Sequence, residues 1–174
     1  MKPVILSFVL LVAVLLGFAW MNGRFGVGLT TTRTIGEKVL YFNPEITLEV
    51  GKEGSVDLMA NYTGAPVAKF YVQFSYDPTI LKIDGVDVNN SVFGNLVENS
   101  VDPQFGTVVL RAESRLALGT LDTGKQKLAT IKMSGLKKGG TVISGSRRPE
   151  VTIWENGKLV EGDFQMQTFK VNVK

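Results

Sequence analysis

The chain has 174 residues, with 19 Lys and Arg against 16 Asp and Glu, and it contains neither Cys nor His. The missing Cys and His exclude disulfides, thiol nucleophiles, His-based acid–base catalysis and nearly all zinc sites. All acidic residues lie from Glu37 onward, and that part of the chain carries 16 charges of each sign. A neutral domain lacks the concentrated basic stripe of a nucleic-acid binder, so we expect no nucleic-acid partner.

The N-terminal region, residues 1–21, contains an uncharged apolar run of 18 residues at positions 4–21, VILSFVLLVAVLLGFAWM. As a helix at ~1.5 Å per residue, this run would extend about 27 Å, close to the ~30 Å hydrocarbon core of a bilayer. The pattern predicts one N-terminal hydrophobic helix that anchors the chain in a membrane. A cleaved secretory signal is the alternative, with the small residues Gly17 and Ala19 near the cut.

Residues 22–38 are rich in Gly and Thr and show little periodicity. Such a composition predicts a flexible linker. With the anchor in place, we expect the remaining domain to stand outside the cell, tethered to the membrane; if the leader is cut, the domain is secreted.

Residues 39–174 are predicted to form an all-β domain. Short alternating or apolar runs are separated by Gly, Pro and Asn turns, and no segment has helical periodicity. The clearest hairpin has its turn at Asn156 and Gly157, the residue pair favoured in a type I′ turn. Residues 89–106 are predicted to be the longest irregular span, and residues 164–173 the last strand. Nine or ten such strands are expected to make a two-sheet antiparallel β-sandwich.

The central strand is predicted at residues 68–76, where apolar and polar residues alternate as AKFYVQFSY. This period of two places one set of side chains in the core and the other outside. Asp77 and Pro78 then end the strand, because Pro has no N–H to give to a sheet ladder. Leu81 and Ile83 resume the alternation after this corner, and Asp84-Gly85 is expected to interrupt the strand that follows.

The segment FYVQFSYDPTILKI, the later KLATIKMSGLKKGGTVI and the closing FKVNV resemble the cohesin family and its carbohydrate-binding relatives. The resemblance covers about residues 40–174 and implies a nine-stranded jelly-roll sandwich. Cohesins are non-catalytic modules that bind dockerins, which are small calcium-dependent partner domains, through one sandwich face. By this resemblance the chain is no enzyme, and its partner is an extracellular dockerin-like protein.

The resemblance places the recognition surface on the outward side of the central strand and on its neighbour at residues 107–113. The partner-binding residues are then Lys69, Tyr71, Gln73, Ser75, Arg111 and Glu113. Tyr71 stands where dockerin-binding cohesins often carry Asp. Tyr is itself frequent in protein interfaces. Solvated outward positions with no partner are the simpler interpretation of the same pattern.

Two further functions remain open at this stage. Exposed aromatics stack on sugars in carbohydrate-binding modules, and the best candidates for contact with a polysaccharide are Tyr62 and Trp154. A surface filament assembled through the N-terminal helix is the other possibility. No cofactor is expected: Asp84, Asp87, Asn89 and Asn90 match no calcium-loop spacing. Asn61 and Asn89 each begin an N-glycosylation triplet.

Overall fold

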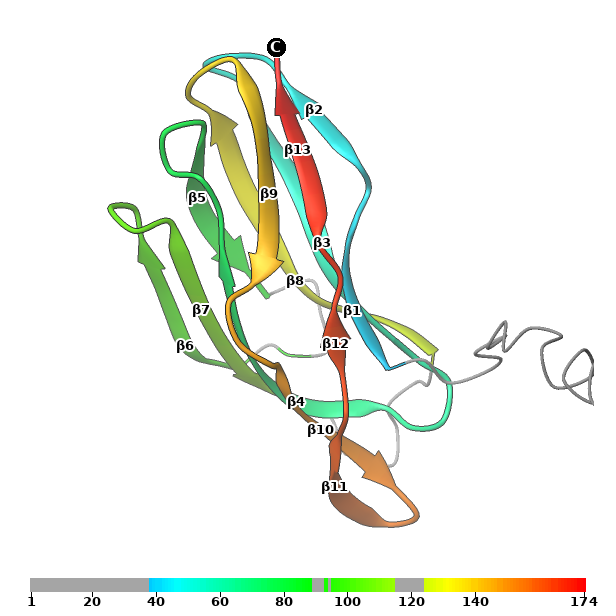
Figure 1. The fold of residues 1–174 in the computed structure, drawn as a ribbon. Coiled ribbons are helices and arrows are strands. Elements are labelled where there is room, and N and C mark those ends of the chain that lie inside the picture. The colour runs from blue at the N-terminus through cyan, green and yellow to red at the C-terminus, as the bar shows by residue number, and fades with distance from the viewer. Residues whose placement is uncertain (1–37, 89–92, 94, 115–123) are drawn as a thin grey trace, which may run out of the picture. The chain divides into compact units, whose positions relative to one another are not determined.

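The computed structural model describes residues 38–88, 93, 95–114 and 124–174, which form a β domain (Figure 1). The described residues contain thirteen strands and no helix, and thus no helical segment able to cross a membrane. The predicted anchor at 4–21 and the linker before Lys38 lie outside the described residues. The strands are β1 (Val39–Asn43), β2 (Ile46–Leu48), β3 (Glu53–Tyr62), β4 (Val67–Ser75), β5 (Leu81–Asp87), β6 (Asn95–Asp102), β7 (Thr107–Glu113), β8 (Gly124–Gly135), β9 (Gly139–Gly145), β10 (Glu150–Glu155), β11 (Lys158–Gly162), β12 (Gln165–Met166) and β13 (Phe169–Val173).

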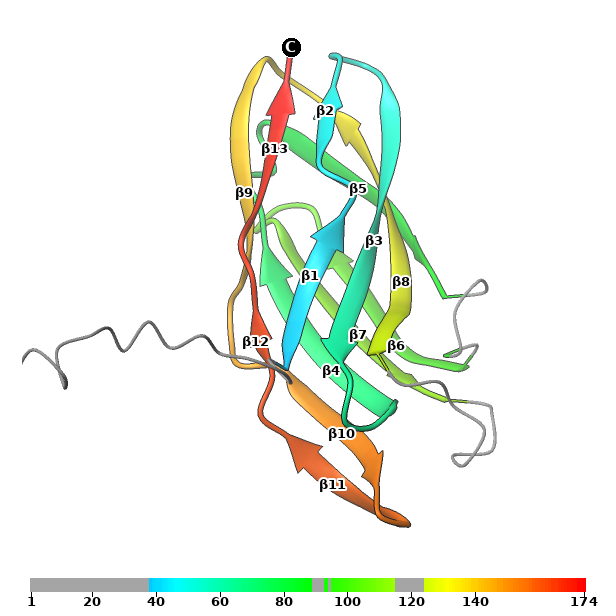
Figure 2. The same ribbon diagram turned by 90° about the vertical axis from the view of Figure 1, so that its right-hand side faces the viewer.

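The strands form two sheets packed face to face, which confirms the predicted two-sheet β-sandwich (Figures 1 and 2). One sheet has the order β12-β1-β3-β8-β5. The other has the order β11-β10-β4-β9-β13-β2, and β7 joins it along the free side of β4, followed by β6. Strand β4 therefore lies between β7 on one side and β10 and then β9 on the other.

The sheets are not wholly antiparallel, which corrects one part of the prediction. Strand β1 pairs with β12 in parallel, and β13 pairs with β2 in parallel. The physical reason is that the chain passes from one sheet to the other both between β1 and β2 and between β12 and β13. Between β1 and β2 it crosses at Asn43-Pro44, where Pro cannot continue the ladder. The predicted last strand at 164–173 is likewise two strands, β12 and β13, one in each sheet.

The core lies between the sheets, and the inward side of β4 contributes two of its largest rings. Phe70 and Phe74 are almost completely buried, and Phe74 meets Phe42 edge-on with ring centroids 5.5 Å apart. Phe70 makes the same kind of contact with Phe93 at 5.1 Å. The buried cluster runs from Leu40 to Val173. The domain thus has a complete core of its own, and we expect it to fold without residues 1–37.

A strand, β6, occupies much of the span at 89–106 that was predicted to be irregular. Its sequence, NLVENSVD, has little regular alternation, because Val97 is an extra residue at a register shift in the pairing with β7. A bulge of this kind moves later side chains to the opposite face and hides the period of two. The predicted interruption at Asp84-Gly85 is confirmed as a register shift of β5.

The corner after β4 is held by Asp77. Its Oδ1 accepts hydrogen bonds from the backbone N–H of Thr79 at 2.8 Å and from the Thr79 hydroxyl at 2.7 Å. Its own N–H donates to the Thr141 hydroxyl at 3.0 Å. The bonds from Thr79 hold the pKa of the Asp77 carboxyl below its usual value.

Replacing Asp77 with Ala is expected to lower the melting temperature by a few degrees at pH 7. The difference should shrink as the pH falls below about 4, since a carboxyl with a depressed native pKa stabilises the fold when ionised and loses this contribution on protonation. Thermal unfolding of both proteins between pH 3 and pH 7 measures this. Asp163→Ala is the control, because it removes only an exposed ion pair. A deficit for Asp77→Ala that stays constant over this range contradicts the assignment.

Gly106 closes the turn between β6 and β7 in a left-handed conformation, with φ of +61°. A Cβ added there would lie 2.2 Å from the backbone oxygen of Tyr76, which cannot move away cheaply. We expect Gly106→Ala to destabilise the domain by roughly 2 kcal/mol or more, measured by denaturant unfolding. Gly85→Ala is the matched control, since no atom lies within 4 Å of its added Cβ. Equal stability of the two variants would show that the turn relaxes.

Candidate binding face

The outward side of β6, β7, β4 and the first residues of β10 (150–152) forms one continuous surface, which we call the outer face. Backbone pairing fixes its rows. Tyr71 on β4 lies opposite Arg111 on β7 and, on its other side, opposite Glu150 on β10. Arg111 in turn lies opposite Glu98 on β6. Directly paired residues share a face, so these four side chains lie in one row across the sheet.

All six predicted partner-binding residues lie on the outer face. Four outward pairs lie directly opposite one another on β4 and β7: Lys69 with Glu113, Tyr71 with Arg111, Gln73 with Val109, and Ser75 with Thr107. Their side chains are exposed or half-buried, whereas the intervening residues of β4 and β7 are buried. The outward residues of each alternating strand thus form this surface.

Several charges on the outer face have no ion-pair partner within 4 Å among the described residues. They include Lys69 and Glu113, which face each other in register, and Arg111 with its neighbour Glu98. An exposed charge without an ion-pair partner loses little free energy in water, and it remains available to a group of opposite sign on another molecule.

Beside these rows the outer face is hollowed next to Tyr71. The hollow has a volume of about 420 Å³, and its lining includes Lys69, Tyr71, Arg111, Arg147 and Glu150. The Arg147 guanidinium lies over the Tyr71 ring, 5.0 Å from its centroid, and forms an ion pair with Glu150. One side of this ring is therefore covered by a cation, an arrangement that stabilises both groups.

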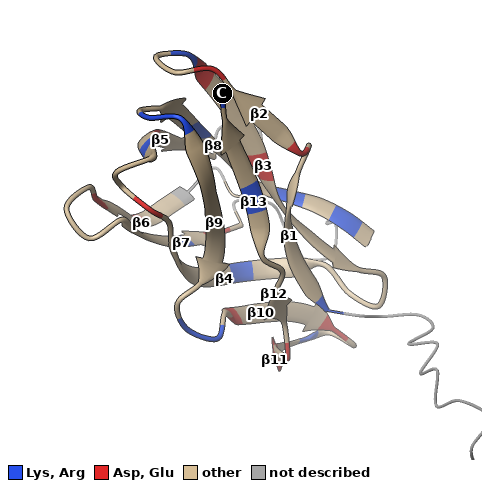
Figure 3. Cartoon of the chain, turned by 45° about the horizontal axis from the view of Figure 1, so that its top comes forward, with Lys and Arg blue, Asp and Glu red and all other residues tan. Residues whose placement is uncertain are grey.

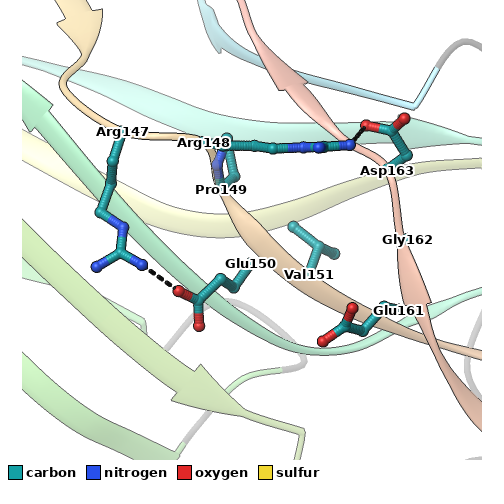
Figure 4. Close-up of a pocket in the computed structure, with 8 residues that line it drawn as sticks. All are labelled: Arg147, Arg148, Pro149, Glu150, Val151, Glu161, Gly162 and Asp163. Carbon is teal, nitrogen blue, oxygen red and sulfur yellow. Dashed lines mark hydrogen bonds and ion pairs between the residues drawn. The ribbon is translucent and has the colours of Figure 1, made fainter.

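A second hollow, of about 460 Å³, adjoins the first and shares Arg147 and Glu150 with it. Figure 4 shows that Arg147 reaches to Glu150 on one side, while Arg148 reaches across to Asp163 on the other. Both arginines come from the connection between β9 and β10, whose basic residues and the acidic start of β10 are adjacent in Figure 3. The lining carries charges of both signs, which suits a partner that does so too.

Comparison with solved structures gives many similar chains. A type I cohesin from Pseudobacteroides cellulosolvens matches with a TM-score of 0.65 at 14% identity, covering 78% of this chain and 91% of the cohesin. The cohesin of a type I cohesin–dockerin complex from Clostridium thermocellum matches with a TM-score of 0.65 at 13% identity, covering 81% of this chain and all of that one. The domain has a cohesin-like fold.

A third similar structure is a non-cellulosomal cohesin from the archaeon Archaeoglobus fulgidus, with a TM-score of 0.60 at 12% identity over 79% of this chain and 91% of that one. No protein-family model matches the sequence, and no curated protein matches it. The comparisons thus establish the cohesin-like fold, as the sequence resemblance predicted.

The sequence did not single out three residues of the outer face of this cohesin-like domain: Arg147, Glu150 and Glu98. Glu98 follows the bulge of β6, so its face could not be assigned from alternation. Arg147 lies in the connection before Pro149, where no strand period applies. The only local signal was the run Arg147-Arg148 between two strands, which by itself does not indicate a face.

The predicted sugar-stacking residues lie at one end of the domain. Tyr62 is half-buried: Lys38 lies over its ring at 4.7 Å, Phe164 packs against it edge-on, and its hydroxyl lies 3.4 Å from Glu155. Burial, together with the nearby Glu155 carboxylate, raises the pKa of Tyr62. Trp154 is half-buried on the outward side of β10. Sugar binding by this pair stays a prediction.

The side chains considered as calcium ligands either bind other groups or lie outside the described residues. Asp84 binds Lys82 at 2.7 Å and accepts a hydrogen bond from Ser134. Partial burial raises the pKa of Asp84, but these two partners outweigh it and the net pKa is lowered. Within the described part of the chain, no three acidic side chains converge as a metal site. Asn89 and Asn90 are not described.

Proposed function

We propose that the chain is a non-catalytic binding module, tethered at the cell surface, that docks an extracellular dockerin-like protein through the outer face. The observation that carries the proposal is the row of Tyr71, Arg111 and Glu98, with Lys69 and Glu113 in the next row. These residues combine an aromatic anchor with charges that have no ion-pair partner among the described residues. Aromatic and Arg side chains of this kind supply most of the energy of protein interfaces.

The cohesin-like fold supports the same proposal. The similar cohesin from Clostridium thermocellum was solved in a complex with a dockerin. The tether is supported by the apolar run at 4–21, which is long enough for a helix to cross a bilayer. Under this proposal residues 22–37 link the anchor to the domain and leave the outer face accessible.

The test is capture by the immobilised domain, residues 36–174, from the secreted and surface proteins of its own organism. We expect one protein carrying duplicated calcium-loop repeats to be retained, and to be lost when calcium is chelated. Retention of polysaccharide alone, or of nothing, would contradict protein docking and favour sugar binding or assembly through the N-terminal segment.

A further inference from the structure

The β10–β11 hairpin protrudes at the end of the domain where the described chain begins (Figures 1 and 2). Its two-residue turn at Asn156 and Gly157 has both residues at positive φ, which confirms the predicted type I′ geometry. Trp154 and Leu159 lie directly opposite each other on its outward side. Leu159 is 48% exposed, which makes it one of the few large apolar side chains turned to solvent among the described residues.

Basic residues at or next to the sheet of β1, β3 and β8 lie at the same end of the domain. Lys38 precedes β1, and Val39, Asn61 and Lys125 lie in one row across β1, β3 and β8. Lys158 lies beside the hairpin turn. Neither Lys125 nor Lys158 forms an ion pair within 4 Å among the described residues.

The two sheets are connected at this end through Tyr62 and Glu155. The Tyr62 hydroxyl, at the end of β3, donates to the carboxylate of Glu155 on β10 across 3.4 Å. The acids next to the hairpin turn are Glu155 and the exposed Glu161, against the three cations Lys38, Lys125 and Lys158. The lysines thus come from both sheets, whereas a partner bound to the outer face would contact only one sheet.

The length of the linker limits how far this end can move from the membrane. The apolar run ends at Met21, and the 16 residues from 22 to 37 extend at most about 55 Å when fully stretched. A tether of this length keeps the domain at a high effective concentration near the bilayer. A surface whose own affinity for lipid is low would therefore still bind it.

We propose that this end of the domain rests on a lipid surface, with Trp154 and Leu159 in the headgroup region and Lys38, Lys125 and Lys158 facing anionic headgroups. Trp favours the membrane–water interface, and each Lys near an anionic surface adds attraction that salt screens. The inference depends on the tethering part of the proposed function. Docking in this way would hold the outer face in a fixed orientation relative to the membrane.

The experiment uses residues 36–174 with an N-terminal His tag held on nickel-chelating vesicles, so that it does not depend on the chain's own anchor. Trp154 is the only Trp in this fragment, because the second Trp of the chain is Trp20. Phosphatidylcholine with a nitroxide on its headgroup quenches a Trp that enters the headgroup region. We expect quenching on vesicles with about 30% phosphatidylglycerol to exceed that on phosphatidylcholine alone by roughly two-fold or more.

Lys125→Glu with Lys158→Glu should abolish the excess quenching, and so should about 0.5 M salt. Lys132→Glu with Lys138→Glu is the control, since it makes the same change of charge at exposed lysines outside this end. Leu159→Ser should reduce quenching with the fold intact by circular dichroism. No excess on anionic vesicles, or equal loss in both double variants, overturns the inference. Partner capture in solution is scored separately; if Leu159→Ser weakens that capture and leaves quenching unchanged, the hairpin belongs to the protein interface.

Discussion

Replacement of Arg111 by Glu is expected to weaken binding of the captured partner by about 100-fold, more than any other single change on the outer face. Arg111 lies between Tyr71 and Glu98 in the central row, and its guanidinium has no ion pair within the described domain. The change removes a cation from the proposed contact and places a carboxylate beside Glu98, so partner groups that Arg111 would bind are repelled. Biolayer interferometry with the captured protein measures the loss, mainly as faster dissociation.

Lys132→Glu is the matched control for this prediction. Lys132 is exposed on β8, in the other sheet, and the substitution changes the net charge by the same amount. We expect its affinity to stay within about two-fold of the original, because rim or remote charges act mainly on the association rate. If both variants lose affinity equally, the effect comes from net charge and the outer face is not the docking surface.

Replacement of Phe74 by Ala should destabilise the domain by about 3–5 kcal/mol. The Phe74 side chain is fully buried near the end of β4, and its ring contacts Phe42 edge-on across the two sheets. The substitution leaves a cavity that neighbouring strands cannot close, since β4 is paired on both sides. Urea unfolding followed by circular dichroism measures the change as a shift of the midpoint.

Phe105→Ala provides the comparison for Phe74→Ala. Phe105 is 72% exposed at the tip of the β6–β7 turn, so removal of its ring should change the free energy of unfolding by less than about 0.5 kcal/mol. A small loss for Phe74→Ala would mean that the sheets repack freely and that β4 is not the centre of the core.

The central part of the fold could be predicted from sequence because its alternation is unbroken. In β4 each apolar residue from Phe70 to Phe74 faces the core, and Asp77-Pro78 ends the strand where the structure shows the corner. Strand β6 could not be predicted, because the bulge at Val97 breaks the period of two. The parallel pairs of β1 and β13 depend on contacts between distant segments, for which local pattern holds no information.

The candidate site, too, could be predicted from the sequence only in part. Lys69, Tyr71, Gln73 and Ser75 could be placed together because they alternate with core residues of one strand. Arg111 followed from the alternation of the next strand in the sheet. Arg147 covers Tyr71 from a connection without periodicity, so only the folded arrangement shows the contact. The cohesins compared with this chain are at most 15% identical to it. This fits a fold that depends on the buried residues of alternating strands, while the surface residues differ.

The central claim is that the outer face docks a protein, and site-directed photo-crosslinking tests it most directly. A photoreactive amino acid would replace Gln73 on the outer face in one protein and Lys132 on the opposite sheet in another, both in the full chain in its own organism. Our account predicts a crosslink from position 73 to the protein that the immobilised domain captures, and none from position 132. A crosslink to that protein from position 132 alone would contradict it.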